Sequence, residues 1–258
     1  MTTSKPIALV TGGASGIGLA SARRLIERGY HVVIVDVEPE SIDAAVDELA
    51  ADITSYRVDV ADPVALQAVV DEVEQTLGPL EYVLGSAGIA RVGPTLEVMR
   101  SDIDLMMSVN YGGIVNLIQS ALPRMLERGH GEFVVIASLT GLLPPKKMAA
   151  YGATKAAIVS YMQSLRYEHE GKGVTLACVC PAAVSTPMAA DFFADPAKRA
   201  KSMATTPETI VAAIEKGLRK KQFLILPGPL ARSIALTSRL TPGLARLVQS
   251  RGRFSDLV

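Results

Sequence analysis

Tyr151 and Lys155 form the pair of side chains best suited to chemistry, because they stand four residues apart in a stretch with helical spacing. Residues at this separation lie on the same face of a helix. A free phenol has a pKa of about 10 and is a poor base at neutral pH. We expect the Lys155 ammonium to favour the phenolate and to lower the pKa of Tyr151. Tyr151 could then accept the proton of an alcohol, or donate a proton in the reverse direction.

Ser138 ends a predicted strand upstream of this pair and could hold the same substrate oxygen against Tyr151. A tyrosine and a lysine at this spacing are also common on exposed helix faces, where they do no chemistry. The strand-ending serine and a glycine-rich turn near the start of the chain favour the chemical interpretation. The other tyrosines of the central region lack such neighbours and are expected to pack: Tyr111, Tyr161 and Tyr167.

The glycine-rich turn from Thr11 to Gly18 follows the first predicted strand and opens a helical pattern. A tight strand-to-helix turn needs residues without Cβ, and a pyrophosphate binds bare backbone N–H groups at a helix N-terminus. Glycines in this context indicate a dinucleotide-binding turn. The residues expected to contribute are Gly12, Ser15, Gly16, Ile17 and Gly18.

Asp36 ends the second predicted strand, downstream of this turn. Its carboxylate can accept hydrogen bonds from both hydroxyls of an adenosine ribose and would repel a 2′-phosphate. No Arg or Lys occurs at positions 12–18 or directly after Asp36, so the sequence predicts NAD rather than NADP. The alternative, that Asp36 merely caps the turn before Pro39, is the weaker interpretation because of the preceding glycines.

From Pro6 to about Met188 the sequence resembles the short-chain dehydrogenase/reductase family. Its motifs occur in the family's order: the TGxxxGxG turn at Thr11–Gly18, Asp59-Val60, Ser86-Ala87-Gly88, Asn110, Ser138, the YxxxK pair Tyr151 and Lys155, and Pro181-Ala182 with Thr186. The match is partial at Gly85-Ser86, where the family has two asparagines, and at Ala182, where it has glycine.

The resemblance implies an oxidoreductase that transfers a hydride between NAD and a secondary alcohol or ketone. It implies four catalytic residues: Asn110, Ser138, Tyr151 and Lys155. Asn110 would hold a water that links Lys155 to solvent. The further implied cofactor contacts, beyond the glycine turn and Asp36, are Asp59, Val60, Ala87, Gly88, Tyr151, Lys155, Pro181, Val184 and Thr186. Two alternatives stay open, an NADP-linked carbonyl reductase and an NAD-binding scaffold without turnover.

Short apolar runs rich in β-branched residues alternate with helix-length segments, as expected for parallel strands covered on both faces. The expected strands are Ile7–Thr11, His31–Asp36, Ser55–Asp59, Tyr82–Ser86, Gly131–Ser138, Val174–Cys180 and Phe223–Leu226. Ser15, Ser41 and Asp62 are expected helix caps. This order predicts a single α/β domain over residues 1–258, a doubly wound, mostly parallel Rossmann-type sheet of about seven strands with helices on both faces.

Three loops at the carboxyl ends of strands are expected to set substrate specificity: Ile89–Leu96, Leu139–Ala149 and Pro187–Thr206. They are rich in apolar side chains and offer no concentrated cationic patch, which favours an apolar, lipid- or steroid-like substrate. Residues 187–206, with the pair Phe192-Phe193, are expected to form a substrate lid.

The C-terminal tail, residues 228–258, is basic. Between Lys216 and Phe254 there are nine basic residues and no acidic one, and arginines recur every seven residues at 232, 239, 246 and 253. One hypothesis is an amphipathic element that lies on anionic lipid. The favoured alternative is a helix packed on the body of the protein or on a partner subunit.

The overall composition argues against several other functions. Basic and acidic residues number 26 each, which gives no reason to expect a nucleic-acid partner. His31, His130 and His169 show no ligand spacing, so no metal is expected, and Cys178 and Cys180 are expected to be buried free thiols. The absence of a secretory or membrane-spanning segment favours a cytoplasmic protein. By family resemblance we expect a homodimer or homotetramer built from helices around 100–128 and 150–170.

Overall fold

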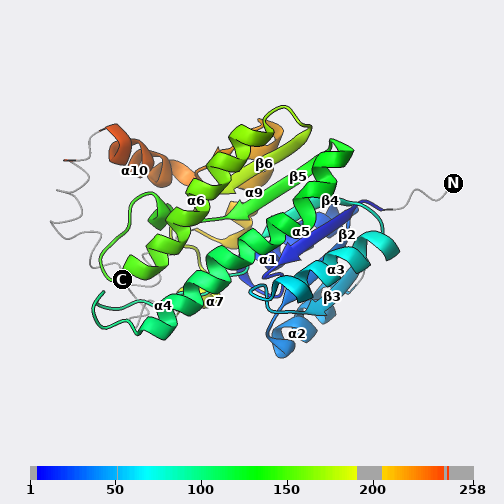
Figure 1. Ribbon diagram of the computed structural model, residues 1–258, viewed down its shortest axis with the longest axis horizontal. Helices are drawn as coiled ribbons and strands as arrows, with labels where there is room; N and C mark the ends of the chain where they lie inside the picture. Colours follow the sequence, from blue (N-terminus) through cyan, green and yellow to red (C-terminus); the bar gives the residue numbers. More distant parts are fainter. Residues whose placement is uncertain (1–4, 51, 191–204, 241–242, 244–258) are drawn as a thin grey trace.

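Seven parallel strands form one sheet, in the order β3-β2-β1-β4-β5-β6-β7, in the computed structural model (Figure 1). The structure describes residues 5–50, 52–190, 205–240 and 243. The strands are β1 (Ile7–Thr11), β2 (His31–Asp36), β3 (Ile53–Arg57), β4 (Leu80–Gly85), β5 (Gly131–Ile136), β6 (Val174–Val179) and β7 (Leu224–Ile225). The strand order reverses direction between β1 and β4, which is where doubly wound folds bind ligands. The predicted fold class is confirmed.

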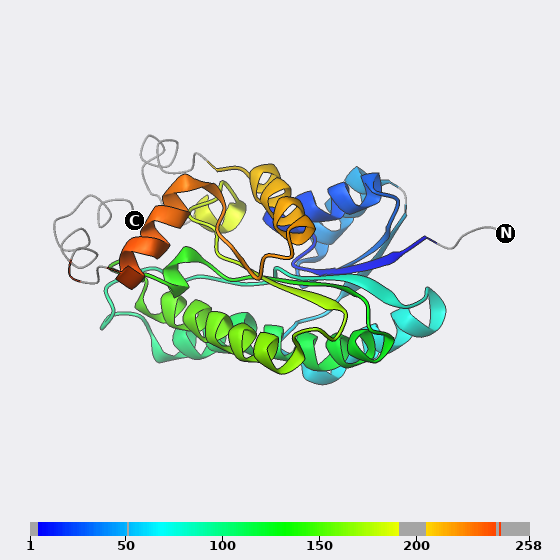
Figure 2. The same cartoon turned by 90° about the horizontal axis from the view of Figure 1, so that it is seen from above.

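Helices cover both faces of this sheet (Figure 2). One face carries α1 (Gly16–Glu27), α2 (Pro39–Leu49) and α9 (Pro207–Arg219), and the other carries α3 (Pro63–Thr76), α5 (Gly113–Arg128) and α6 (Ala149–His169). Shorter elements are α4 (Arg100–Met106), the π-helical segment η1 (Met107–Gly112), the 3₁₀ turn η2 (Leu139–Gly141) and α7 (Pro187–Ala190); α10 (Gly228–Leu240) follows β7. In the described part of the chain, no helix is long and apolar enough to cross a membrane.

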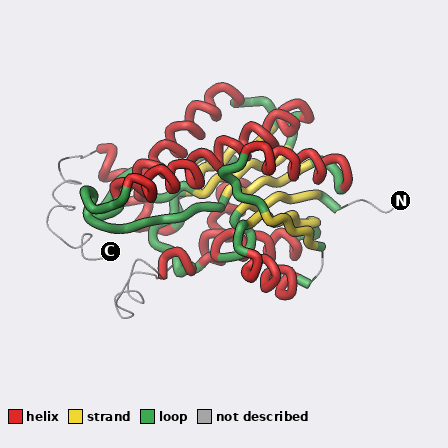
Figure 3. Tube along the Cα trace, turned by 60° about the horizontal axis from the view of Figure 1, so that its bottom comes forward, coloured by secondary structure: helices red, strands yellow, loops and turns green. Residues whose placement is uncertain are grey.

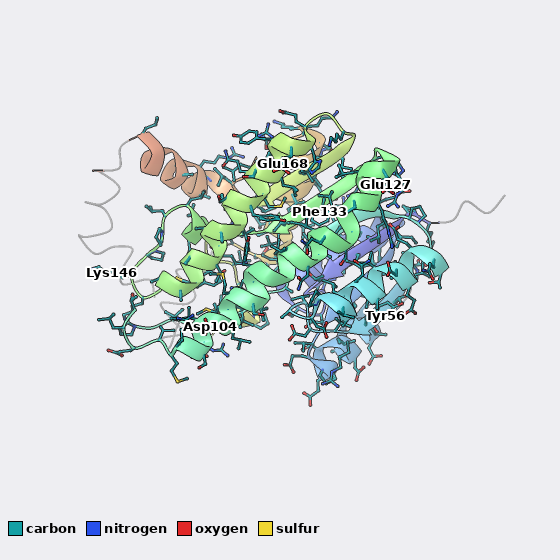
Figure 4. All side chains as sticks on the ribbon, in the orientation of Figure 1. Tyr56, Asp104, Glu127, Phe133, Lys146 and Glu168 are labelled. Carbon is teal, nitrogen blue, oxygen red and sulfur yellow. The ribbon has the colours of Figure 1, made fainter. Side chains whose placement is uncertain are left out.

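The central strands are buried along their whole length because both of their faces are covered by helices. Every residue of β1 is buried, and so are Phe133 and the three residues that follow it in β5. Phe133 lies at the centre of the molecule (Figure 4) and belongs to the core on the α3, α5 and α6 side. This continuous apolar character is what the sequence runs predict for parallel strands.

Several element boundaries differ from the sequence prediction. The strand β3 begins at Ile53 and ends at Arg57, two residues earlier than expected at each end. Asp62 caps α3 as predicted, accepting from the backbone N–H groups of Val64 and Ala65. Ser41 was wrong as a cap, because α2 begins at Pro39, whose fixed φ suits the first helical position.

The longer loops gather at one end of the molecule (Figure 3). These loops follow β4 and β5, and they connect to the first turns of α4 and α6. All seven strands are parallel, so their carboxyl ends point the same way. Functional side chains at the ends of β1, β4, β5 and β6 are therefore brought to one edge of the sheet.

Candidate active site

The first turns of α6 carry Tyr151 and Lys155 into the interior. Their exposed fractions are 8% and 4%. The Lys155 Nζ lies 5.7 Å from the centroid of the Tyr151 ring and donates to the backbone oxygen of Ile136 at 3.1 Å. The spacing of four residues therefore places both side chains on one buried face, as predicted, and the exposed-pair alternative does not apply.

Ser138 lies between β5 and η2, and its side chain is also buried. The Ser138 hydroxyl is hydrogen-bonded to the phenol of Tyr151. Its Oγ also accepts from the backbone N–H of Thr140 at 3.1 Å and from the Thr140 hydroxyl at 2.9 Å. Sequence reasoning missed Thr140, because its only signal was a hydroxyl two residues after the strand-ending serine.

The electrostatic balance at Tyr151 differs from the expectation. Burial raises the pKa of Tyr151 to about 12, and the hydrogen bond from Ser138 opposes this only in part. Burial also lowers the pKa of Lys155 to about 8. The predicted lowering of the pKa of Tyr151 is therefore wrong for the protein alone, because desolvation of the phenolate is the largest effect on this group.

Asn110 reaches the same site from η1, where the helix is widened by π-type hydrogen bonding. Its side chain is fully buried and pairs with the backbone of Ile89 in both directions, at 2.8 and 2.9 Å. The second amide hydrogen goes to Thr154 Oγ1 at 3.0 Å, and Thr154 donates to the backbone oxygen of Tyr151. Both amide hydrogens are used, so a water at this side chain could only donate to Oδ1. Thr154 is a second residue that no sequence motif indicated.

The segment after β4 brings Gly88 close to the side chains of Asn110 and Lys155. A Cβ added to Gly88 would lie 3.1 Å from Asn110 Oδ1 and 3.7 Å from Lys155 Nζ. Gly85 departs from the family pattern, and its Cβ would overlap the Ile114 side chain at 2.6 Å. Packing by α5 therefore fills the space that an asparagine at position 85 would require.

The glycine turn lies beside this segment, at the junction of β1 and α1. Gly12 has φ +66°, and a Cβ there would lie 2.7 Å from the backbone nitrogen of Ala87. Gly16 has φ +53° and faces Thr186, whose Cγ2 would be 3.1 Å from an added Cβ. Side chains at these two positions would be strained and would fill the turn. A turn with bare backbone at a helix N-terminus fits the diphosphate of a dinucleotide.

Asp36 closes the turn from β2. Its Oδ2 accepts from the backbone N–H of Ala14 at 3.0 Å, and its Oδ1 accepts from Val37 at 2.8 Å. Arg57 is aligned with Asp36 in the β2–β3 register, and its Nε donates to the backbone oxygen of Val37 at 3.3 Å. The sequence argument considered only positions 12–18 and the residues directly after Asp36, and it missed Arg57, which the pairing of β2 with β3 aligns with Asp36.

The other predicted cofactor contacts lie along the same edge of the sheet. Asp59 accepts from Ala61 at 2.9 Å, and Val60 is buried against Gly113. Pro181 follows β6 and accepts from Leu139. Val184 bridges to Thr205, and Thr186 accepts from Ala189 at 3.4 Å. Ser15, Ile17 and Gly18 belong to the glycine turn and the start of α1. Their roles remain predictions.

An apolar cluster surrounds Tyr151 on the loop side. Its buried members are Ala90, Met106, Met148 and Tyr151, and its partly buried members are Ile89, Val92, Val98, Ala150 and Met188. All three predicted substrate loops supply residues to this cluster, the third through Met188. Lys146 and Asp104 lie toward the same end of the molecule (Figure 4), and Lys146 is exposed.

Two predicted regions fall largely outside the described residues. Of the predicted lid at 187–206, the structure describes α7 and residues 205–206 only. Of the tail at 228–258 it describes α10 and residue 243, with Ala231 and Ala235 buried and Arg232 exposed. Both regions therefore stay predictions.

The remaining candidate ligands lie away from the site or in the core. Cys178 and Cys180 are free and buried, as predicted. Among the described residues, no group of three or more His, Cys, Asp or Glu side chains could hold a metal ion.

Comparison with known proteins gives consistent matches. The family model described as short chain dehydrogenase matches residues 6–197. Oxidoreductase UcpA of Escherichia coli is 31% identical over 220 residues, covering 84% of this chain and 81% of the relative. The C alpha-dehydrogenase of a Sphingobium species is 30% identical over 248 residues, covering 88% of this chain and 81% of the relative. A short chain dehydrogenase/reductase from Burkholderia phymatum, solved in complex with NAD, has a TM-score of 0.84 at 25% identity and covers 96% of this chain and 97% of that one.

Proposed function

The chain belongs to the short-chain dehydrogenase/reductase family of oxidoreductases, and we propose that it uses NAD to interconvert a secondary alcohol and a ketone. The observation that carries this proposal is the convergence of Asn110, Ser138, Tyr151 and Lys155. They come from η1, the end of β5 and α6, and all four side chains are buried beside the segment that contacts the glycine turn.

Tyr151 transfers the proton in this proposal. Its raised pKa keeps the phenol protonated at neutral pH, so it can donate to a carbonyl oxygen during reduction. Oxidation needs the reverse transfer, and the Ser138 hydroxyl stabilises the phenolate by donating to it. A bound oxidised nicotinamide supplies the hydride acceptor and a positive charge near the site. Ser138 also orients the substrate oxygen against Tyr151.

Lys155 holds a positive charge beneath the ring of Tyr151, fixed in place by the Ile136 carbonyl. Asn110 secures the loop after β4 by pairing with Ile89, which keeps Gly88 against Lys155. In the proposed mechanism Asn110 and Lys155 also hold the water that returns protons to solvent.

NAD is the proposed cofactor because the Asp36 carboxylate lies at the glycine turn, where it would oppose a 2′-phosphate. Arg57 favours the second candidate, an NADP-linked reductase, because this cation is aligned with Asp36 in the sheet and donates to the backbone oxygen of the next residue, Val37. In this structure Arg57 is exposed and bonded to a backbone oxygen, so Asp36 is the group already placed against the turn.

The proposed substrate is apolar, since the described surroundings of Tyr151 are a cluster of methionine and aliphatic side chains. The proposed assembly is a homodimer or homotetramer. Exposed Leu105 and Met107, on α4 and η1, support a subunit contact in the predicted region 100–128.

The decisive experiment follows NADH absorbance during incubation of the protein with a panel of apolar secondary alcohols and, in reverse, ketones. Tyr151→Phe is the matched control, because it keeps the ring and removes only the hydroxyl that transfers the proton. We expect turnover in the wild type, none in the variant, and nearly equal NAD affinity in both. Near-normal hydride transfer by the variant would refute the mechanism. NAD binding without turnover across the panel would favour the scaffold alternative.

A further inference from the structure

Thr140 supplies two hydrogen bonds that the Ser138 side-chain oxygen accepts. Its Oγ accepts from the Thr140 backbone N–H at 3.1 Å and from the Thr140 hydroxyl at 2.9 Å. A serine hydroxyl has two acceptor lone pairs and one O–H donor. Both lone pairs are therefore occupied, and the O–H is the one hydrogen-bonding capacity left.

We propose that Thr140 is a positioning residue, which fixes the Ser138 hydroxyl as a donor toward Tyr151 and the substrate oxygen. This inference rests on the proposed function and deepens it. Because Ser138 cannot accept a third hydrogen bond, the Tyr151 hydroxyl cannot donate to it. The Tyr151 proton is then directed to the substrate, and the Ser138 proton is available to whichever oxygen carries negative charge.

The local fold explains how Thr140 occupies both lone pairs of the Ser138 oxygen. Ser138 occupies the cap position of η2, so the turn itself aims the Thr140 N–H at Oγ. That backbone bond alone would leave one lone pair free for the phenol of Tyr151. The Thr140 hydroxyl takes this second position. The turn is held against α6, since a Cβ on Gly141 would lie 2.7 Å from the backbone of Lys155.

Without the Thr140 hydroxyl, Ser138 regains an acceptor and the bond to Tyr151 can reverse. A hydrogen bond that the neutral phenol donates stabilises the protonated form and raises its pKa. The same reversed bond takes the Tyr151 proton away from the substrate. A residue that served only to cap η2 would produce neither effect, because the backbone N–H of position 140 remains after substitution.

The test compares Thr140→Val, which removes the hydroxyl and keeps the branched shape, with Thr140→Ser, which keeps the hydroxyl. Ionisation of Tyr151 is followed by NMR of ring-labelled tyrosine, with the Tyr151→Phe spectrum identifying the signal. We expect ionisation to begin at higher pH in Thr140→Val than in wild type, and at the wild-type pH in Thr140→Ser. Thermal unfolding shows whether each variant is folded, and Thr140→Ala replaces Thr140→Val should that protein not fold.

Turnover of the best alcohol or ketone from the panel gives a second measurement. We expect Thr140→Val to lose about twofold to tenfold in kcat, with a smaller change in KM, the range expected for one hydrogen bond. The alcohol-oxidation profile should move to higher pH, and Thr140→Ser should restore both properties. Thr76→Val, on an exposed turn of α3, controls for a general threonine effect.

An unchanged Tyr151 titration in Thr140→Val would overturn the proposal, and so would an equal change in Thr140→Ser. The NMR measurement needs neither substrate nor cofactor. Its result therefore stands apart from that of the proposed oxidoreductase activity.

Discussion

Tyr151 and Lys155 are almost fully removed from water, and burial shifts their pKa values in opposite directions. The pKa of the phenol rises to about 12 and that of the amine falls to about 8. Each shift disfavours a charge in the interior. At neutral pH the protein alone therefore holds Tyr151 as a protonated phenol, beside a lysine whose charge is disfavoured by burial.

Lys155→Met should show the stability cost of this lysine. A lysine whose pKa is lower in the folded chain binds fewer protons when folded, so wild-type stability rises with pH between about 8 and 10.5. The shift corresponds to about 3 kcal/mol. We expect the variant to lack this rise. The stability advantage of Lys155→Met over wild type is therefore greatest below about pH 8, the lysine pKa in the folded chain. It decreases by about 3 kcal/mol as the pH rises to 10.5, the pKa in the unfolded chain.

Chemical denaturation across this pH interval measures the effect, and Tyr151→Phe serves as a control that keeps the lysine. Parallel stability profiles for wild type and Lys155→Met would contradict the lowered pKa. Loss of turnover in Lys155→Met would accompany the gain in stability and would not affect the comparison.

Asp36 accepts a hydrogen bond from Ala14 in the glycine turn, and the oppositely charged Arg57 is aligned with Asp36 in the β2–β3 register. We expect wild type to bind NAD more tightly than NADP, because the carboxylate repels a 2′-phosphate. Asp36→Asn should shift the ratio of the two dissociation constants toward NADP by about tenfold, the effect of one charge-assisted bond. Adding Arg57→Gln should remove that gain. Tighter binding of NADP than of NAD by wild type would show that Arg57, and not Asp36, decides the preference.

At the scale of elements, a few close approaches between backbones hold the site together. The η2 turn lies against the start of α6 at Gly141, and the loop after β4 is pinned to η1 by Asn110. The π-type widening of η1 places Asn110 in the interior, fully buried. None of these contacts involves neighbouring residues in the sequence, so the site depends on how elements dock.

Gly141→Ala should show whether the contact between η2 and α6 affects catalysis apart from its effect on stability. Its Cβ would lie 2.7 Å from the Lys155 backbone, so η2 must move away from α6 and carry Ser138 from Tyr151. Gly29→Ala is the control, since Gly29 has φ +87° and open space around it. We expect Gly29→Ala to lose about 1 kcal/mol of stability with unchanged kcat. Gly141→Ala should lose kcat at least tenfold, about 1.4 kcal/mol in the barrier. Equal kcat in both variants would contradict a positioning role for this contact.

At the scale of the whole molecule, the two ends of the sheet have different characters. The carboxyl ends carry the hydrogen-bonded groups of the site. The amino end carries Glu132, at the start of β5, whose Oε2 is buried without a hydrogen-bond partner, and which is paired in register with the buried Tyr82. Burial raises the pKa of Glu132, and Arg28 opposes this shift. An ionised carboxylate here weakens the fold.

Glu132→Gln should therefore stabilise the protein at neutral pH. A carboxyl group with a raised pKa binds its proton more tightly in the folded chain, so wild-type stability falls as pH rises from the ordinary glutamate value to the raised one. The variant lacks this fall. The expected difference in melting temperature is large near neutral pH and small below the ordinary value of about 4.3. A difference independent of pH would contradict the assignment.

The sequence by itself determined the strand pattern, the dinucleotide turn and the pair on α6. These features are local, since apolar runs, glycines without Cβ and a four-residue helical spacing each fix conformation over a few neighbouring residues. The fold class followed from their order along the chain.

Only the tertiary structure decided the chemistry around those residues. The register of two strands aligns Arg57 with Asp36. Thr140 and Thr154 complete the hydrogen bonds of Ser138 and Asn110, and burial raises the pKa of Tyr151. Desolvation and contacts between strands depend on which distant segments exclude water from a group. These pKa shifts and contacts therefore depend on how the folded chain packs, and they cannot be derived from a short stretch of sequence.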